Sequence, residues 1–295
     1  MLLPKSRALP LIFVLIILLF SSCSESQNGL ERSVSEDKAA EEIFNSGEKE
    51  ILRKRYGDAA EKFKEVERLY PYSDWSKRAL IMQVYALHKD QAYESVVSAA
   101  NRFIEFHPND KDAPYAYYLI GLSYYDQVLE IGRDQKLTQE ALAVFKLIIE
   151  EYPNSEYALS SQIKFDFLRD HLASKEMEVG RYYLKRAHFV PAINRFRRVI
   201  EDFSTTSQVP EALHRLVEAN LSLGLIDEAQ TAGAILGYNY KSTEWYERTF
   251  ELLKSEGLKP KSSGNSWLSQ IYRQVIKGQC YKPSCFVSSK SKIFY

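Results

Sequence analysis

The chain has 295 residues, of which 45% are hydrophobic, so it is long enough for one or two domains with a real core. Its 39 basic and 39 acidic side chains balance formally, which argues against a dedicated nucleic-acid-binding protein. Only 12 glycines and 10 prolines occur, and this scarcity of backbone breakers favours an all-helical fold. With three cysteines, the chain has no disulfide framework.

Residues 1–22 have the layout of a secretory signal peptide. Lys5 and Arg7 precede an apolar run from Leu9 to Phe20, and small residues follow it. The run is too short to span a bilayer core, which needs roughly 20 apolar residues. The sequence Ser21-Ser22-Cys23 resembles a lipobox, in which the cysteine thiol receives a diacylglyceryl group before cleavage, although Phe20 departs from the usual pattern. We therefore expect lipidation of Cys23; a plain signal peptide with an incidental cysteine is the alternative.

Residues 23–38 are polar and weakly patterned, so we interpret them as the lipidated N-terminus and a flexible tether. A triacylated Cys23 would anchor the chain stably, because lasting membrane attachment needs at least two acyl chains. Ser24, rather than Asp, follows the cysteine, which predicts export onward to the outer membrane.

The body of the chain, residues 39–256, repeats one register of residues. A small residue is followed by Ala twelve positions later, by Phe four after that and by Pro eight after that, as in Gly47, Ala59, Phe63 and Pro71. Four further units keep the order with losses and insertions: Val96, Phe103 and Pro108 in the second; Gly121, Ala141, Phe145 and Pro153 in the third; Gly180, Ala192 and Phe196 in the fourth; Leu213, Ala229 and Leu236 in the fifth.

This register resembles the tetratricopeptide pattern, in which each unit is a helix–turn–helix of about 34 residues. Small residues let two helices approach closely, aromatic and aliphatic residues form the buried stripe, and proline ends the second helix. Each pair leaves an apolar face that only the next pair can cover, so the units come in series. The predicted fold class is therefore all-α, a superhelix of about five tetratricopeptide-like repeats. An insertion around Glu130–Gln139 and a long helix from about Glu156 to Lys185 make the series irregular.

The sequence contains no recognisable catalytic or cofactor motif. Its five histidines form no H-E-x-x-H arrangement, and no two lie three or four residues apart as metal ligands on one helix face would. A nucleophile elbow, a phosphate loop and a dinucleotide-binding glycine pattern are also missing. We therefore predict that the protein is not an enzyme and has no cofactor or metal. A metalloprotease with a repeat arm, the enzymatic alternative, lacks a recognisable ligand set.

The tail, residues 257–295, has seven Lys and Arg side chains and no Asp or Glu. Its amphipathic stretch from Trp267 to Lys277 has two open interpretations. It is either a helix that caps the last repeat or a segment that docks to an anionic lipid or an acidic partner. Cys280 and Cys285 either close a small disulfide loop in an oxidising periplasm or remain two thiols.

Five stretches between about Glu42 and Leu236 together resemble the BamD (ComL) family of outer-membrane assembly lipoproteins. Their order and spacing behind a lipobox are more specific than a generic repeat match. Two features depart from the family pattern: the basic tail lies outside the shared region, and Gly57 stands where a polar or basic residue is expected. The stretches are Arg68–Ser76 (RLYPYSDWS), Asn101–Pro108 (NRFIEFHP), Tyr152–Tyr157 (YPNSEY), Leu168–Leu172 (LRDHL) and Val179–Arg195 (VGRYYLKRAHFVPAINR).

The resemblance implies five repeats attached to the periplasmic face of the outer membrane. In this family the C-terminal repeats hold the last POTRA domain of the barrel protein BamA, and the N-terminal repeats receive the C-terminal signal of unfolded barrel substrates. The implied partners are a BamA-like protein with POTRA domains, other subunits of the complex and unfolded outer-membrane proteins, with no nucleic acid. The implied residues are Arg195 and Tyr183 for the partner, and Tyr70, Pro71 and Tyr72 for the substrate.

Physical chemistry makes both assignments reasonable, and both have alternatives. An arginine suits an acidic partner because guanidinium–carboxylate contacts are bidentate, and aromatic side chains beside a groove suit an extended, aromatic-ended peptide. However, Tyr70 and Pro71 are also ordinary helix-ending residues, and Arg195 could be a solvated surface residue. For the whole protein, the alternative is an envelope repeat lipoprotein that organises peptidoglycan synthesis or cell division; the long helix and the Tyr-Pro-Tyr-Ser loop speak against it.

Overall fold

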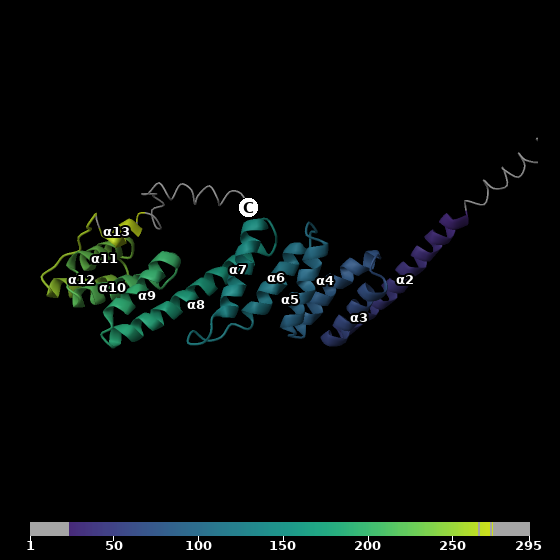
Figure 1. Cartoon of the computed structure of the whole chain (residues 1–295), viewed down its shortest axis with the longest axis horizontal. Coiled ribbons are helices and arrows are strands. Elements are labelled where there is room, and N and C mark those ends of the chain that lie inside the picture. Colours follow the sequence, from purple (N-terminus) through teal and green to yellow (C-terminus); the bar gives the residue numbers. More distant parts are fainter. Residues whose placement is uncertain (1–23, 265, 272, 274–295) are drawn as a thin grey trace, which may run out of the picture. The chain divides into compact units, whose positions relative to one another are not determined.

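The computed structural model describes residues 24–264, 266–271 and 273. Within these residues the chain is a series of α-helices without a strand (Figure 1), so the predicted all-α class is confirmed. The helices, in chain order, are α2 (Ser24–Leu52), α3 (Tyr56–Leu69), α4 (Asp74–Lys89), α5 (Tyr93–Phe106), α6 (Ala113–Tyr125), α7 (Lys136–Glu151), α8 (Ala158–Lys185), α9 (Phe189–Asp202), α10 (Val209–Ser222), α11 (Ile226–Asn239), α12 (Glu244–Ser255) and α13 (Trp267–Ile271).

The predicted helix–turn–helix units correspond to consecutive helices, α2/α3 through α10/α11, and α12 and α13 follow them. The chain forms two compact units, Met1–Ser123 and Tyr124–Tyr295. In the described part of the chain, no helix combines the length and the apolar character that crossing a bilayer requires.

The core of the first unit is built around Phe63 of α3. Ala59, Phe63 and Val66 recur at helical spacing and are fully buried, because α3 packs with this face against α2 and α4. The ring of Phe44 on α2 lies 5.2 Å from that of Phe63 and 5.0 Å from that of Trp75 on α4. Each such aromatic side chain contributes roughly 1.5–3 kcal/mol by leaving water.

The core of the second unit runs from α8 to α13. Phe196 of α9 is fully buried and shares a cluster with Met177 of α8 and Leu213 of α10. Leu253 of α12 and Leu268 of α13 belong to the same cluster, so the residues behind the last repeat also contribute to the core. The register residues predicted to be buried are fully buried throughout: Ala59, Phe63, Val96, Phe103, Ala141, Phe145, Ala192, Phe196, Ala229 and Leu236.

Small residues let the helices of a pair approach closely, as predicted. A Cβ atom added to Gly47 would lie 2.8 Å from Cε1 of Phe63, closer than side chains tolerate. Gly180 of α8 stands in the same relation to Phe196 of α9. In both pairs the glycine therefore provides the space that the phenylalanine ring fills.

The turn inside a pair passes through the left-handed backbone region in four of the units. Only one of these positions is a glycine, the residue that adopts this conformation without strain. The positions and their φ angles are Lys54 (60°), Gln91 (60°), Ala187 (58°) and Gly224 (73°).

The two irregularities of the series lie where the sequence predicts them. The long helix expected from about Glu156 is α8, which packs against α7 on one side and α9 on the other. The insertion forms the loop 126–135 between α6 and α7, and only its expected last residues belong to α7. The Gln135 side chain organises this loop, since its Nε2 donates to the carbonyls of Glu130, Ile131 and Arg133 at 3.2, 3.4 and 3.1 Å.

The structure differs from expectation at both ends of the repeat region. Helix α2 begins at Ser24, so residues 24–38 are helical rather than the flexible segment that we expected; their role as a tether stays a prediction. Behind α12, α13 packs on α11, so part of the predicted tail belongs to the fold. This agrees with the capping interpretation for residues 267–271.

Candidate functional site

The two residues expected to bind a partner, Tyr183 and Arg195, line one hollow of about 410 Å³ on the second unit. Tyr183 lies in the last turn of α8, and Arg195 follows on α9 after the tight turn at Ala187. Because the turn folds α9 back against α8, residues twelve apart in the sequence share one surface. The structure therefore brings these two predicted residues together. The other lining residues are Val190, Pro191, Asn194 and Arg198.

A carboxylate on α8 orients both arginines of the hollow. Glu176 accepts from Nη1 of Arg195 at 3.0 Å and lies 3.1 Å from Nη1 of Arg198, through its two different oxygens. Its side chain is only 12% exposed, so it lies beneath the arginines rather than at the surface. Charge-assisted hydrogen bonds of this kind hold a long side chain in one conformation. Less conformational entropy is therefore lost when a ligand binds.

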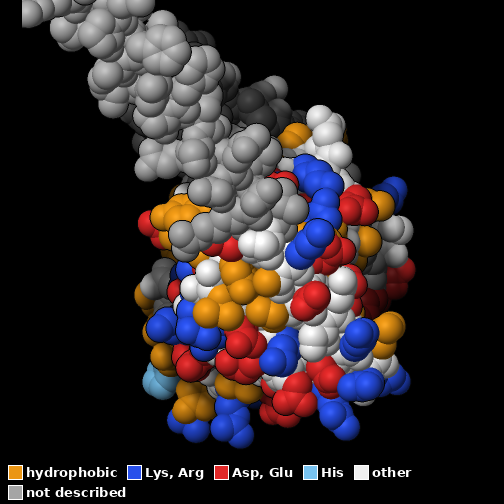
Figure 2. Space-filling view, turned by 90° about the vertical axis from the view of Figure 1, so that its right-hand side faces the viewer, with side chains coloured by type: hydrophobic (Ala, Val, Ile, Leu, Met, Phe, Trp, Pro, Cys, Tyr) orange, Lys and Arg blue, Asp and Glu red, His pale blue; other side chains and the backbone are white. Residues whose placement is uncertain are grey.

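The hollow exposes guanidinium groups, while the carboxylates that balance their charge lie outside its lining. Its lining contains two guanidinium groups and no carboxylate, because Glu176 lies underneath and Asp202, 3.3 Å from Nε of Arg198, follows one turn further along α9. Elsewhere the charges are mixed: on the face drawn in Figure 2, Lys and Arg side chains alternate with Asp and Glu. The hollow can therefore bind a carboxylate on a partner surface.

Tyr183 forms the aromatic side of this hollow. Its ring packs edge-on against Tyr182, with centroids 5.7 Å apart, and against His188 at 6.4 Å. It is half-buried and touches the core cluster of the second unit, so its position is fixed by the fold. Neither Glu176 nor Arg198 was expected from the sequence.

The residues expected to bind substrate, Tyr70, Pro71 and Tyr72, form the turn between α3 and α4. Tyr70 caps α3 with its amide donating to the carbonyl of Val66, and its half-buried ring packs on the core of the first unit. Ser73 closes the turn, because its amide and hydroxyl both donate to the carbonyl of Tyr70, at 3.1 and 2.9 Å. Its hydroxyl then accepts from the amide of Ser76 and caps α4.

Four other turns in the described part of the chain repeat this geometry. In each, the residue that caps a helix is aromatic or histidine, and the amide three residues later donates to its carbonyl at 3.0–3.1 Å. Tyr70 thus has a structural role that recurs at the end of each repeat, and proline follows the cap in three of the five turns; substrate binding by Tyr70 and Pro71 stays a prediction. The five caps and their donors are Tyr70 and Ser73, His107 and Asp110, Tyr152 and Ser155, Phe203 and Thr206, and Tyr240 and Thr243.

Tyr72 distinguishes the first turn from the others. The third position of every turn is exposed, and in the other four it is a small polar residue. Tyr72 is fully exposed, at 100%, so its ring makes no packing contact that would stabilise the fold. A fully exposed aromatic ring at a fixed turn is available for contact with a ligand. The third positions are Tyr72, Asn109, Asn154, Thr205 and Ser242.

Two predicted chemical sites, made of three cysteines, lie outside the described residues. They are the lipidation site Cys23, which follows the predicted signal peptide, and the pair Cys280 and Cys285. Within the residues that the structure describes, no group of three or more His, Cys, Asp or Glu side chains could hold a metal ion.

Comparison with known protein families assigns the chain to one family. The YfiO family, described as outer membrane lipoprotein, matches residues 36–235, which contain both the first turn and the arginine hollow. The chain belongs to this family. Its matched region begins inside α2 and ends near the C-terminus of α11, so the segment that carries α12 and α13 lies beyond it.

Several relatives of this chain are named outer membrane protein assembly factor BamD. The one from Caulobacter vibrioides is 42% identical over 77% of this chain and 74% of its own length. The relative from Rickettsia prowazekii is 41% identical over 72% and 85%, and that from Neisseria meningitidis serogroup A is 26% identical over 82% and 94%. These names denote assembly factors rather than enzymes, and on this ground the prediction of a non-catalytic protein is confirmed.

Among solved structures, PilW, a type IV pilus biogenesis factor, is 9% identical and covers 72% of this chain and 98% of its own, with a TM-score of 0.34. A likeness at this level supports no inference about function.

Proposed function

We propose that this chain is a lipid-anchored scaffold of the machinery that assembles β-barrel proteins into the outer membrane. Lipid on Cys23 would hold it on the periplasmic face, with no cofactor and no turnover. The C-terminal repeats bind a BamA-like barrel protein with POTRA domains, and the N-terminal repeats bind unfolded outer-membrane proteins. The names of the relatives favour this role over the organisation of peptidoglycan synthesis or division.

The observation that carries the proposal is the arginine hollow on α8 and α9. Two guanidinium groups, held from beneath by Glu176, face outward beside Tyr183. Arginine and tyrosine are the residue types that dominate binding energy at protein interfaces. A carboxylate on a folded partner domain fits this surface, because it can accept two hydrogen bonds from the planar guanidinium group.

The first turn supports the second half of the proposal. Tyr72 projects fully exposed from a turn that Ser73 and Tyr70 hold rigidly. An extended, aromatic-ended substrate segment can pack against such a ring while the chain around it stays in place. Tyr72 is the main contact, and Tyr70 and Pro71 position it.

The experiment that tests the proposal is a detergent pull-down from envelopes of the native organism, with the full chain as bait. We expect the wild type to recover a β-barrel protein with POTRA domains, and Arg195→Glu to lose it, because the new carboxylate repels the partner's acid. The matched control is Arg68→Glu, an exposed arginine of α3 that also neighbours an acidic residue, Glu65 at 4.0 Å. Recovery of division or cell-wall proteins in place of the barrel protein would contradict the proposal.

A further inference from the structure

The segment behind α12 is fixed to the last repeat by polar contacts with α11. Glu228 accepts from the hydroxyl of Ser266 at 2.6 Å and from the amide of Trp267 at 3.3 Å. Gln230 donates from its side chain to the carbonyl of Lys259 at 2.8 Å. These contacts set the position of α13, although the segment lies beyond the residues that the family match covers.

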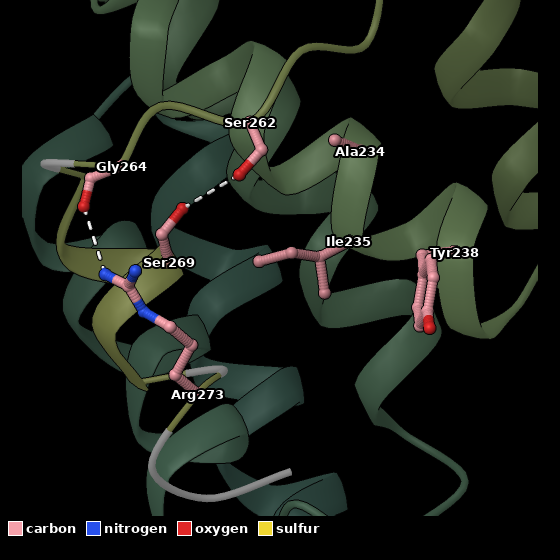
Figure 3. A pocket seen from close by; sticks show the side chains of 7 residues that line it. All are labelled: Ala234, Ile235, Tyr238, Ser262, Gly264, Ser269 and Arg273. Atoms are coloured by element: carbon pink, nitrogen blue, oxygen red, sulfur yellow. Dashed lines mark hydrogen bonds between the residues drawn. The ribbon is translucent and has the colours of Figure 1, made fainter. Parts of the chain in front are cut away.

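Further contacts inside the segment hold its shape. The hydroxyls of Ser262 and Ser269 lie 3.3 Å apart, and Arg273 donates from Nη2 to the carbonyl of Gly264 at 3.1 Å (Figure 3). Leu268 is 2% exposed and joins the core. The segment is therefore a built part of the second unit.

Trp267 reaches from this segment to α9. The guanidinium carbon of Arg197 lies 3.7 Å from the centroid of the Trp267 ring, which is stacking distance. Arg197 also lies 3.8 Å from Glu201, so its charge is already compensated. Trp267 is thereby held beside α9, next to the arginine hollow.

A groove of about 270 Å³ lies between α9, α10, α11 and this tryptophan. Its volume is below the roughly 300–1,000 Å³ of small-molecule pockets and suits a single large side chain. The charged groups that line it, Arg197 and Glu228, are engaged by Trp267, Glu201 and Ser266. Apart from Asn194 and Asn220, the rest of the lining is apolar. Exposed apolar side chains line it: Val190 (59%), Leu223 (40%) and Leu225 (47%).

The groove and the arginine hollow adjoin each other, because both are lined by Val190 and Asn194 of α9. On α9, Val190, Asn194 and Arg197 face the groove, whereas Asn194, Arg195 and Arg198 face the hollow. These two stripes at helical spacing lie side by side. One surface therefore combines a subsite of guanidinium donors with an apolar subsite.

We propose that the groove between α9 and Trp267 is the second half of the partner-binding surface and receives a large apolar side chain of the same partner. This rests on the proposed function. The partner domain presents a carboxylate to Arg195 and, beside it, an aliphatic or aromatic side chain to the groove. Hydrogen bonds from the guanidinium groups of the hollow orient the domain, and burial of the apolar side chain strengthens the complex.

The test measures the affinity of the full chain for the purified POTRA domains of the organism's BamA-like protein. Leu225→Glu places a charge in the groove, and Trp267→Ala removes its wall. We expect each variant to weaken binding by about tenfold, the effect of losing one well-buried apolar contact. Thermal unfolding of both variants checks that the second unit remains folded.

The matched control is Leu159→Glu on α8, which is 75% exposed and lines neither the groove nor the hollow. It should bind like the wild type. If Arg195→Glu weakens binding while Leu225→Glu and Trp267→Ala match Leu159→Glu, the groove is not part of the interface, although the proposed function stands. If Arg195→Glu is also without effect, both proposals are wrong.

Discussion

The turn after α3 and the hollow on α9 belong to different copies of the same helix–turn–helix repeat, yet they expose different kinds of side chain. The turn presents an uncharged, fully exposed tyrosine, Tyr72, on a backbone geometry that recurs in four other turns. The hollow presents two arginines that Glu176 orients from a second helix. The tyrosine ring offers an apolar contact, which needs no charged group to orient it. The arginines offer a charged contact, which depends on Glu176 to hold the guanidinium groups in place.

This difference separates the framework from the features placed on it. Gly47 and Phe63 in one unit, and Gly180 and Phe196 in the other, make the same close contact and determine stability. The packing of the repeats does not depend on the side chains of Tyr72 and Arg195. We therefore expect substitutions of the framework to unfold the protein, and substitutions of the exposed features to leave stability intact.

The largest effect is expected for Phe196→Ala. It removes a fully buried ring and leaves a cavity beneath Gly180, so the free energy of unfolding should fall by about 3–5 kcal/mol. Denaturant unfolding followed by circular dichroism measures this. Phe106→Ala, at a ring that is 62% exposed, is the control and should cost less than about 1 kcal/mol. Equal losses in the two variants would refute the framework role of Phe196.

Tyr72→Ala should lower the affinity for an extended peptide with an aromatic C-terminus by about tenfold, because an interface tyrosine typically contributes this much. Its free energy of unfolding should stay within about 0.5 kcal/mol, since the ring makes no buried contact. Fluorescence anisotropy of a labelled peptide measures the affinity. Asn154→Ala, at the same position of a later turn, is the control and should change nothing; a comparable loss in that variant would show that Tyr72 is not distinctive.

The second turn should respond to pH. The hydrogen bond from Lys77 to Asp110, at 2.7 Å, holds the pKa of Asp110 below its usual range despite partial burial of the carboxyl, and the amide of Asp112 adds to this. A lowered pKa stabilises the fold above the unfolded value of about 3.9 and ceases to do so as the pH falls through the folded value.

Lys77→Met should therefore lower the free energy of unfolding near neutral pH by up to about 1 kcal/mol, because the pair is partly exposed. The difference from the wild type should persist at pH of about 4 and vanish only as the pH falls through the lowered pKa of folded Asp110, where the carboxyl becomes protonated in both proteins. Unfolding curves at neutral pH and at a pH below that pKa measure it. A difference that persists below that pKa would mean that Lys77 stabilises the turn without Asp110.

The smallest effect is expected inside the fourth pair. Ala187 adopts φ of 58°, a conformation that glycine adopts without strain and that Gly224 occupies in the next pair. Ala187→Gly should raise the free energy of unfolding by about 0.5–1 kcal/mol, after the greater freedom of glycine in the unfolded chain is subtracted. Gly224→Ala should lower it by a similar amount. Thermal unfolding compares the two, and changes of the same sign would contradict the strain.

The sequence predicts the framework well because its signals are local and periodic. The glycine, alanine and phenylalanine register predicts which residues are buried, and the spacing between units predicts the insertion and the long helix. Three of the five turns are also legible, since proline follows the cap at Pro71, Pro108 and Pro153.

Contacts between helices leave no such signal. Glu176 lies nineteen residues before Arg195, and nothing in the local pattern pairs them. The contacts of Glu228 with Ser266 and Trp267 span almost forty residues for the same reason. The helix at residues 24–38 was missed because its polar composition lacks an apolar stripe, which is the signal that sequence reading depends on.

Helix α8 sets a limit on how this protein can change in evolution. It packs against α7 with one part and against α9 with another, over 28 residues without interruption. Inserting or deleting one residue in its middle would rotate the part that packs on α9 by about 100° relative to the part that packs on α7. Length variation should therefore accumulate in the loop 126–135, whereas α8 keeps its length to the residue.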